Sequence, residues 1–571
     1  MIHWKEYPLN VVSEILLHDF NTGKKIFDGD TDKIIPRAQK SVDEKILRTR
    51  SIAEVFTPVT VVKFMVDNLE LENIFWQNRV ESKCLEVACG EAPFITTRYD
   101  AESGEEIPAA ERVGILDRKF QAIPKNVVDK FGYAVRAVQS CYGYELQADS
   151  LLIARANVLL SFVDFVGDCS VDELRDVAEI ISKNFWLMDG LDLPDAQGSL
   201  FAVTNEIKIV DWFDDKREIF FTGGNAMKFD FLISNPPYQD DTNAKGFAPP
   251  LYDKFMDAAP KIADKSVLIT PARFLFDAGA TPKDFNRRML NNPHLKVLDY
   301  APDARKYFRN VDIEGGVVVT IQDTTKNFGA IGTFIPWDEL RSASEKVITR
   351  PDFKPLNEIV YSQKSFKLNE NFCTENPDML NYFKIRSGST IGTNFFVELS
   401  KYFFDDKPDD GREYIRIIGK FGTARVYRWV RRDYVNAPEP LYKWKVFVPE
   451  ANGASGKIVE NESSRIISTP VVGEPNEGCT ETFITIGAFD TRDEAENCLT
   501  YIKSKFARVM LGILKATQHA TPATWAKVPL QDFSASSDID WSGDVDGQLY
   551  RKYNLSDAEI NFIETHVKEM P

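Results

Sequence analysis

The sequence "FDFLISNPPYQD" places a run of mostly apolar residues directly before Asn-Pro-Pro-Tyr. The side chain of Asn235 offers a carboxamide oxygen and Pro236 offers a backbone carbonyl, so two acceptors follow each other. Pro236 and Pro237 fix φ near about −65° and donate no backbone hydrogen bond, which makes the segment rigid. Tyr238 adds a flat ring on which a base can stack. A plain proline turn is the alternative, but it commonly needs only one proline.

Two rigid acceptors can bind both hydrogens of an aromatic amino group. Such an amine is a poor nucleophile because its lone pair is delocalised into the ring, and the two hydrogen bonds favour the pyramidal geometry that frees it. Asn235, Pro236, Pro237 and Tyr238 are therefore the candidate catalytic residues. This chemistry requires no metal, and the scattered cysteines and five histidines predict no zinc site and no disulfide framework.

Acidic residues close three apolar runs upstream of this segment. Glu86 ends the first, in "CLEVACGEAPF", and small residues follow it at Ala88, Cys89 and Gly90. Small residues let the backbone turn closely beneath a ligand, although any nucleotide-binding fold can have such a turn. Glu145, in "YGYEL", can accept hydrogen bonds from two ribose hydroxyls. Asp189, in "LMDGL", can accept one from the exocyclic amine of adenine.

The segment "EVFTPVTVVKFMVDNLE" predicts an amphipathic helix. Thr57 stands at a plausible N-cap and Pro58 at the first helical position, and apolar side chains follow on one face. By itself this pattern indicates an ordinary capped helix.

Short apolar runs alternate with helical patterns from about residue 80 to residue 325. Buried parallel strands read as continuous hydrophobic runs, and their alternation with helices predicts an α/β fold with a doubly wound sheet. Ligands of such sheets bind across the carboxyl ends of the strands. The acidic strand ends and Asn235 are therefore expected along one edge of the sheet.

The composition of the sequence changes near residues 325–335. Beyond this point Gly, Pro, aromatic residues and short β-like runs become frequent. We predict an N-terminal extension over residues 1–50, a catalytic domain over 51–325, a mixed α+β domain over 326–530 and a helical tail over 531–571. In the tail, Ser556 and Glu559 form a capping-box pattern.

Charge is distributed unevenly along the 571 residues. The formal net charge of −17 argues at first against nucleic acid as a partner. However, the stretch from Arg412 to Lys445 contains nine basic and three acidic residues, interleaved with Tyr, Trp and Phe. A solvated face of a β-rich domain is the alternative, but the aromatic residues favour a nucleic-acid surface. Candidate nucleic-acid contacts are Arg425, Arg428, Arg431, Arg432, Lys443 and Lys445.

The N-terminal segment "MIHWKEYPLN" is not typical of a secretory signal, and the apolar runs fall short of the roughly 18–20 residues that span a bilayer. We therefore expect a cytoplasmic protein without a membrane partner.

Together these motifs resemble the adenine-N6 DNA methyltransferases of restriction–modification systems. The family pattern Phe-Thr-Pro matches Phe56 to Pro58, its acidic-x-Ala-Cys-Gly element matches Glu86 to Gly90, and Asn-Pro-Pro-Tyr matches Asn235 to Tyr238. The acids of its second and third strands match Glu145 and Asp189. The resemblance covers about residues 50–325, and the tail is also similar to tails of this group.

This resemblance implies a class I methyltransferase sheet, a C-terminal target-recognition domain and S-adenosylmethionine as methyl donor. The cofactor-binding residues would be Phe56, Thr57, Pro58, Glu86, Ala88, Cys89, Gly90, Glu145, Asp189 and Asn235. The substrate would be double-stranded DNA, from which the target adenine is flipped onto Tyr238. Phe308 is a candidate for a second stacking contact, or else a core residue. A cognate restriction endonuclease is an expected partner.

Two features depart from the family pattern. Ala92 and Pro93 stand where a second glycine usually precedes Phe94, so the turn is expected to hold the cofactor differently. The distance from Gly90 to Glu145 is also long, which indicates an insertion that covers the cofactor or contacts DNA.

Three other activities fit parts of the pattern. Asn-Pro-Pro-Tyr also occurs in methyltransferases that act on a protein glutamine, but those are similar to smaller proteins without a recognition domain. RNA adenine methylation uses identical chemistry. A fused enzyme that also cuts DNA is the third, although about 50 residues before Phe56 are few for a nuclease domain. A non-catalytic DNA-binding subunit is disfavoured by the intact Asn235 motif.

Overall fold

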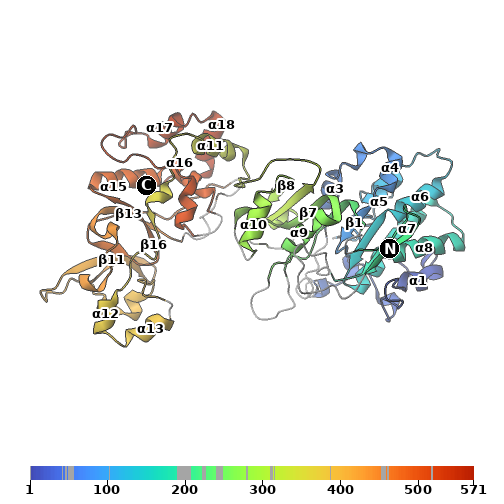
Figure 1. Cartoon of the computed structure of the whole chain (residues 1–571), viewed down its shortest axis with the longest axis horizontal. Coiled ribbons are helices and arrows are strands. Elements are labelled where there is room, and N and C mark those ends of the chain that lie inside the picture. Colours follow the sequence, from blue (N-terminus) through green and yellow to red (C-terminus); the bar gives the residue numbers. More distant parts are fainter. Residues whose placement is uncertain are drawn as a thin grey trace. The chain divides into compact units, whose positions relative to one another are not determined.

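The computed structural model of the chain describes residues 2–41, 43–45, 48, 57–101, 103–189, 207–221, 227–239, 249–277, 281–308, 313, 315–385, 388–451, 458, 462–515 and 519–570. The chain divides into an N-terminal unit, Met1–Phe334, and a C-terminal unit, Ile335–Pro571 (Figure 1). The predicted boundary lay at residues 325–335, and this division falls just after Phe334.

The N-terminal unit is built on a seven-stranded sheet with the strand order β3-β2-β1-β6-β7-β9-β8. The strands are β1 (Cys84–Val87), β2 (Cys141–Glu145), β3 (Phe185–Leu187), β6 (Phe229–Ser234), β7 (Ala263–Pro271), β8 (Leu295–Ala301) and β9 (Val317–Asp323). β1 is parallel to both β2 and β6, whereas β9 is antiparallel to β7 and β8. The predicted α/β architecture is confirmed, with a mixed rather than an all-parallel sheet. A separate hairpin pairs β4 (Lys208–Asp211) with β5 (Arg217–Phe220).

Alternating side chains of the strands pack into two different hydrophobic clusters, one on each face of the sheet. In β1, for example, Cys84 belongs to one cluster and Leu85 to the other. The first face carries α1 (Leu9–Leu17), α3 (Val59–Asp67), α4 (Trp76–Glu81), α5 (Ile115–Ala122), α6 (Lys130–Gln139), α7 (Ala148–Val166) and α8 (Val171–Asn184). The second carries α9 (Tyr252–Ile262) and α10 (Lys283–Leu290). Burial on both faces explains why the strands read as continuous apolar runs.

The C-terminal unit contains two small sheets. One has the order β10-β16-β13-β14 and the other the order β12-β11-β15. Their strands are β10 (Val360–Tyr361), β11 (Tyr414–Phe421), β12 (Ala424–Arg431), β13 (Trp444–Pro449), β14 (Val471–Gly473), β15 (Glu477–Cys479) and β16 (Phe483–Phe489). The helices are α11 (Asp338–Ile348), α12 (Glu370–Glu375), α13 (Met379–Ile385), α14 (Phe395–Glu398), α15 (Arg492–Lys503), α16 (Lys505–Gly512), α17 (Val545–Lys552) and α18 (Asp557–His566).

Helix α18 begins as its sequence predicted. The hydroxyl of Ser556 accepts from the Glu559 backbone, and the Glu559 carboxylate accepts from the Ser556 backbone at 2.6 Å. This capping box satisfies two backbone donors at the start of the helix. Side chains of α18 pack in one hydrophobic cluster with those of α11 and α16.

Short 3₁₀ helices connect many of these elements. They lie at Thr31–Lys33, Arg37–Gln39, Leu71–Asn73, Ala272–Phe276, Ala304–Lys306, Leu356–Ile359, Ser400–Tyr402, Arg432–Tyr434, Glu439–Tyr442 and Pro522–Lys527. Among the described residues, no helix combines the length and apolar character needed to cross a membrane.

Arg155 on α7 is fully buried and ties α1, α8 and β3 together through backbone carbonyls. Its Nε donates to the carbonyl of Phe185 at 2.9 Å and its Nη2 to that of Ser182 at 3.0 Å. Its Nη1 donates to the carbonyls of Leu16 and, at 2.9 Å, His18. Burial lowers the pKa of this guanidinium to about 10. The side chain therefore satisfies several buried carbonyls at once.

Replacing Arg155 by alanine is expected to lower the free energy of unfolding by about 3 kcal/mol, because each carbonyl left without a donor costs about 1–3 kcal/mol. Urea denaturation followed by tryptophan fluorescence measures this loss. As a control, Arg175→Ala removes an arginine whose side chain is 56% exposed, and should change stability by less than about 0.5 kcal/mol. Equal urea midpoints for the two variants would contradict the structural role of Arg155.

Candidate active site

A side-chain hydrogen bond joins the carboxyl ends of β1 and β6. Ser234, the last residue of β6, donates from Oγ to the carbonyl of Val87, the last residue of β1, at 2.6 Å. Glu86 is paired with Ile233 in this register. Asn235 therefore leaves the sheet directly beside the turn that follows β1.

The turn after β1 is tightly wound. Ala88, Gly90 and Ala92 all have a positive φ, of 48°, 54° and 59°. The Glu86 carboxylate accepts from the backbone N–H groups of Phe94 at 3.4 Å and Ile95 at 3.0 Å, so it holds the far end of the turn. Burial raises the pKa of the Glu86 carboxyl well above its usual range despite these two hydrogen bonds. A left-handed alanine costs roughly 1–2 kcal/mol relative to glycine, so Ala88 and Ala92 hold a strained conformation.

Glu145 joins the end of β2 to this turn. Its carboxylate accepts from the N–H of Gly90 at 2.8 Å and from that of Gln147 at 2.9 Å. The carbonyl of Glu145 accepts from Met188 at 3.1 Å, which brings the next residue, the exposed Asp189, to the same edge of the sheet. The three predicted acidic residues thus follow neighbouring strands in order. The hydrogen bonds of Glu145 to a ribose and of Asp189 to an adenine amine remain predictions.

Thr57 contacts the Asn-Pro-Pro-Tyr segment rather than capping a helix. The prediction of an N-cap at Thr57 is wrong by one residue, because α3 begins at Val59 with Pro58 at the N-cap and without a side-chain cap. The buried hydroxyl of Thr57 instead accepts from Nδ2 of Asn235 at 3.2 Å. Since a carboxamide is planar, this contact turns Oδ1 of Asn235 away from Thr57.

Tyr238 lies in a short return of the chain after β6. Its carbonyl accepts from Leu251 at 3.1 Å, and Gln239 forms an antiparallel bridge with Pro250. The residue as a whole is half-buried, and its hydroxyl is buried and has no hydrogen-bond partner in the described part of the chain. Burial raises the pKa of this phenol well above its usual range, so the group stays neutral.

Two aromatic residues were predicted to contact ligands, Phe56 the cofactor and Phe308 the flipped base. Phe56 lies outside the described residues. Phe308 is 3% exposed and packs in the same hydrophobic cluster as Tyr307. Of the two interpretations of Phe308, the structure therefore favours the core residue over the stacking contact.

The insertion between Phe94 and Glu145 folds against α7. Arg112 forms an ion pair with Asp164 at 2.8 Å, and Arg98 pairs with the same carboxylate. Asp117, at the start of α5, accepts from Gly114 at 3.0 Å and from Thr97 at 2.9 Å. Burial raises the pKa of Asp117 to about 6. The part of the insertion containing these residues is thus packed against the body of the unit.

Most of the predicted DNA-contacting arginines already have partners inside the C-terminal unit. Arg428 pairs with Asp405, and Arg431 pairs with Glu375 at 2.6 Å and with Asp433 at 2.5 Å. Two further contacts are those of Arg432 with the Tyr442 hydroxyl and of Lys443 with Asp490. Arg425 has no carboxylate partner among the described residues; its guanidinium lies 5.4 Å from the centre of the Phe483 ring.

Lys445 is fully buried instead of exposed. Its ammonium donates to the carbonyls of Glu474 at 2.6 Å and Lys443 at 2.9 Å, and burial lowers its pKa to about 7. The prediction that Lys445 contacts DNA is therefore corrected, because the side chain cannot reach a phosphate without abandoning these carbonyls. The described residues contain no group of three His, Cys, Asp or Glu side chains that could hold a metal ion.

Part of the N-terminal unit is similar to a known protein family. Residues 139–308 match the family model of the Eco57I restriction-modification methylase. This part of the chain is thus similar to the Eco57I restriction-modification methylases. This region includes β2, β3 and β6 with Glu145, Asp189 and the whole of Asn235 to Tyr238.

Individual relatives cover smaller parts of the chain. A Mycoplasma pneumoniae protein described as an uncharacterized adenine-specific methylase is 28% identical over 111 residues, which is 18% of this chain and 26% of the relative. The type I restriction-modification methyltransferase subunit from Streptococcus thermophilus is 16% identical with a TM-score of 0.26, over 48% of this chain and 44% of that one. The type IIL restriction-modification enzyme MmeI in complex with DNA is 10% identical with a TM-score of 0.36, over 92% and 77%.

Three contacts in this site were not foreseen from the sequence. Ser234 directly precedes Asn-Pro-Pro-Tyr, and this position could have indicated its hydrogen bond to the carbonyl of Val87. The Thr57–Asn235 contact joins residues 178 positions apart and leaves no local pattern. The two N–H groups that Glu86 binds belong to the very segment, around Phe94, that departs from the family pattern.

Replacing Glu145 by alanine is expected to release the turn after β1, because the Gly90 N–H loses its acceptor. Hydrogen exchange at the Gly90 amide should accelerate by about 5- to 150-fold, as expected for roughly 1–3 kcal/mol of lost protection. Glu111→Ala removes an exposed glutamate of the same unit and should leave this rate unchanged. An unaltered Gly90 rate in the Glu145 variant would show that the carboxylate does not hold the turn.

Proposed function

We propose that this chain is a site-specific DNA methyltransferase that transfers a methyl group from S-adenosylmethionine to N6 of a flipped adenine. The observation that carries the proposal is Asn235 in Asn-Pro-Pro-Tyr at the end of β6, held by Thr57 beside the strained turn of β1. The match of residues 139–308 to a restriction-modification methylase favours DNA over RNA or protein as the methyl acceptor. The biological setting that we infer is a restriction–modification or related defence system, with a cognate nuclease as partner.

The residues at the strand ends suit S-adenosylmethionine. Glu145 and Asp189 supply carboxylate acceptors at successive strand ends, appropriate for ribose hydroxyls and an adenine amine. The small residues Ala88 and Gly90 let the backbone pass close beneath a ligand. Thr57, followed by Pro58, lies near the same place because its hydroxyl accepts a hydrogen bond from Asn235. Bound there, the cofactor supplies an activated methyl group on a sulfonium. The sheet would then be that of a class I methyltransferase.

The chain's own groups prepare the amine. Oδ1 of Asn235 and the carbonyl of Pro236 accept the two N6 hydrogens, which withdraws the nitrogen lone pair from the adenine ring. Thr57 keeps the Asn235 carboxamide in the orientation that presents Oδ1. The ring of the half-buried Tyr238 provides the face on which the flipped base stacks. The C-terminal unit would act as the target-recognition domain.

The proposed function is tested by incubating the protein with labelled S-adenosylmethionine and duplex DNA of varied sequence, duplex RNA or a release-factor protein. Label is expected in DNA alone, at N6 of adenine. Absence of transfer to any DNA would refute the proposal, and transfer to RNA or to protein alone would replace it.

Asn235→Ala is expected to lower the rate of methyl transfer by about 10²–10³-fold, the usual effect of deleting one preorganised hydrogen-bonding group. Binding of S-adenosylmethionine, measured by calorimetry, should persist. Asn291→Ala, an exposed asparagine at the end of α10, should keep the normal rate. Near-normal turnover of the Asn235 variant would remove the acceptor role.

Thr57→Val keeps the shape of the side chain but removes the hydroxyl that accepts from Nδ2 of Asn235. Loss of this hydrogen bond removes about 1–3 kcal/mol of the free energy that orients the Asn235 carboxamide. This predicts a fall in kcat of roughly 5- to 150-fold with little change in cofactor affinity. Thr57→Ser should restore the rate because it restores the hydroxyl. If cofactor affinity fell in parallel with kcat, Thr57 would be a cofactor contact and not a positioning residue.

A further inference from the structure

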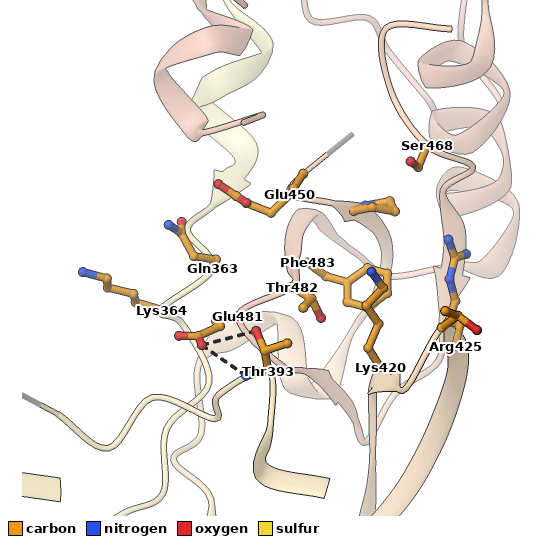
Figure 2. A pocket seen from close by; sticks show the side chains of 13 residues that line it. Gln363, Lys364, Thr393, Lys420, Arg425, Glu450, Ser468, Glu481, Thr482 and Phe483 are labelled. Atoms are coloured by element: carbon orange, nitrogen blue, oxygen red, sulfur yellow. Dashed lines mark hydrogen bonds between the residues drawn. The ribbon is translucent and has the colours of Figure 1, made fainter. Parts of the chain in front are cut away.

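The C-terminal unit contains a pocket of ≈ 550 Å³ at the tip of the β11–β12 hairpin (Figure 2). Lys420 and Arg425 line it from the hairpin, and Phe483 lines it from the start of β16. Glu450 and Glu481 also belong to its lining. In Figure 2, Lys420 and Arg425 lie on one side and Glu481 on the other. The pocket thus has a cationic side formed by two neighbouring strands.

Lys420 and Arg425 are directly opposite each other in the antiparallel ladder. Like charges at opposed positions repel, and in a hairpin they destabilise the pairing. Both residues are exposed, and neither has a carboxylate partner within the described residues. An anion bound between the two side chains would relieve their repulsion.

The other arginines of the hairpin are neutralised. Arg416 pairs with Glu477 and, at 3.2 Å, with Glu474. Arg428 and Arg431 also pair with carboxylates, as described above. Within β11 and β12, the basic side chains that have no carboxylate partner among the described residues are therefore Lys420 and Arg425, at the pocket end of the hairpin.

Arg425 is held in place by a ring. Its guanidinium lies 5.4 Å from the centre of the Phe483 ring, and Phe483 is 2% exposed and therefore fixed. A guanidinium beside an aromatic ring is stabilised by a cation–π interaction, and its planar fork of N–H groups matches the oxygens of a phosphate. A positioned guanidinium next to a lysine is suited to phosphate binding.

The two carboxylates of the pocket limit where an anion can bind. Glu481 accepts from the N–H of Thr393 at 3.1 Å and from its hydroxyl at 3.3 Å, and Glu450 contacts the His519 ring at 2.9 Å. Their negative charge disfavours phosphate on their side. The favourable position is against the hairpin, between Lys420 and Arg425.

We infer that Lys420 and Arg425 hold a phosphate of the DNA backbone in this pocket. This inference rests on the proposed function, which requires the chain to bind duplex DNA. It moves the principal phosphate contact away from Arg428, Arg431 and Lys445, which the structure pairs or buries, to a lysine that the sequence did not single out.

The test compares the double variant Lys420→Gln/Arg425→Gln with a control that removes equal charge elsewhere in the unit, Lys401→Gln/Arg492→Gln. The control side chains are 63% and 65% exposed. Fluorescence anisotropy of a labelled duplex between 50 and 200 mM KCl gives the slope of log affinity against log salt. This slope changes by about 0.9 for each phosphate that the protein no longer neutralises.

The pocket variant should bind more weakly and show a slope shallower by about 0.9, the value for one phosphate, whereas the control keeps the wild-type slope. Lys420→Arg/Arg425→Lys keeps both charges and should restore most of the slope. Matching urea midpoints exclude unfolding as the cause. A slope equal to that of the control would overturn the inference.

Two further measurements separate the possible failures. Inorganic phosphate is titrated as a competing probe: if the variant lost only phosphate competition and kept its duplex slope, the pocket would serve a free anion instead of DNA. Methyl transfer by the pocket variant at saturating duplex should approach the wild-type rate, because the reacting groups are untouched. A wild-type protein that binds duplex but transfers no methyl would refute the proposed function alone and leave the phosphate contact standing.

Discussion

The parallel strands of the N-terminal unit end at one edge, and their terminal backbone groups must be satisfied there. A buried N–H or carbonyl without a partner costs about 1–3 kcal/mol, so the chain uses the polar side chains of this edge to pair them. Ser234 donates to the carbonyl of Val87, and Glu145 accepts from the N–H of Gly90. Glu86 accepts from a backbone N–H of the segment after the turn. The shape of the candidate active site is a product of this requirement. The same carboxylates that pair with these backbone groups are those that the sequence predicted to bind a ligand.

This arrangement also accounts for the small residues of the turn after β1. Three left-handed residues in five positions bring the chain back over the sheet within a short distance. Larger side chains would fill the space above the strand ends, and β-branched ones would resist the left-handed conformation. The structure accepts strain at Ala88 and Ala92 because Glu86 and Glu145 anchor both sides of the turn.

The features of the fold that depend on a local sequence pattern could be predicted. Strands buried on both faces appeared as continuous apolar runs, so the α/β sheet and the polar residues at its strand ends could be predicted. Partners distant in the sequence could not: the charge of Arg431 was visible, but not the Glu375 carboxylate that neutralises it. Lys445 was misjudged because a basic run was treated as a surface, whereas β13 directs this side chain into backbone carbonyls. Thr57 was assigned to its own helix because nothing local indicates Asn235.

The contact between Thr57 and Asn235 closes a loop of 178 residues. Closing a long loop costs conformational entropy that only later contacts recover, so such pairings form late in folding. β1, β2 and β3 can assemble from the first part of the chain, but β6 must then insert beside β1 before Asn235 has its partner. The geometry proposed to bind the amine is therefore among the last parts of the unit to form. A nascent chain still short of β6 contains the acidic strand ends without the groups that would act on a base.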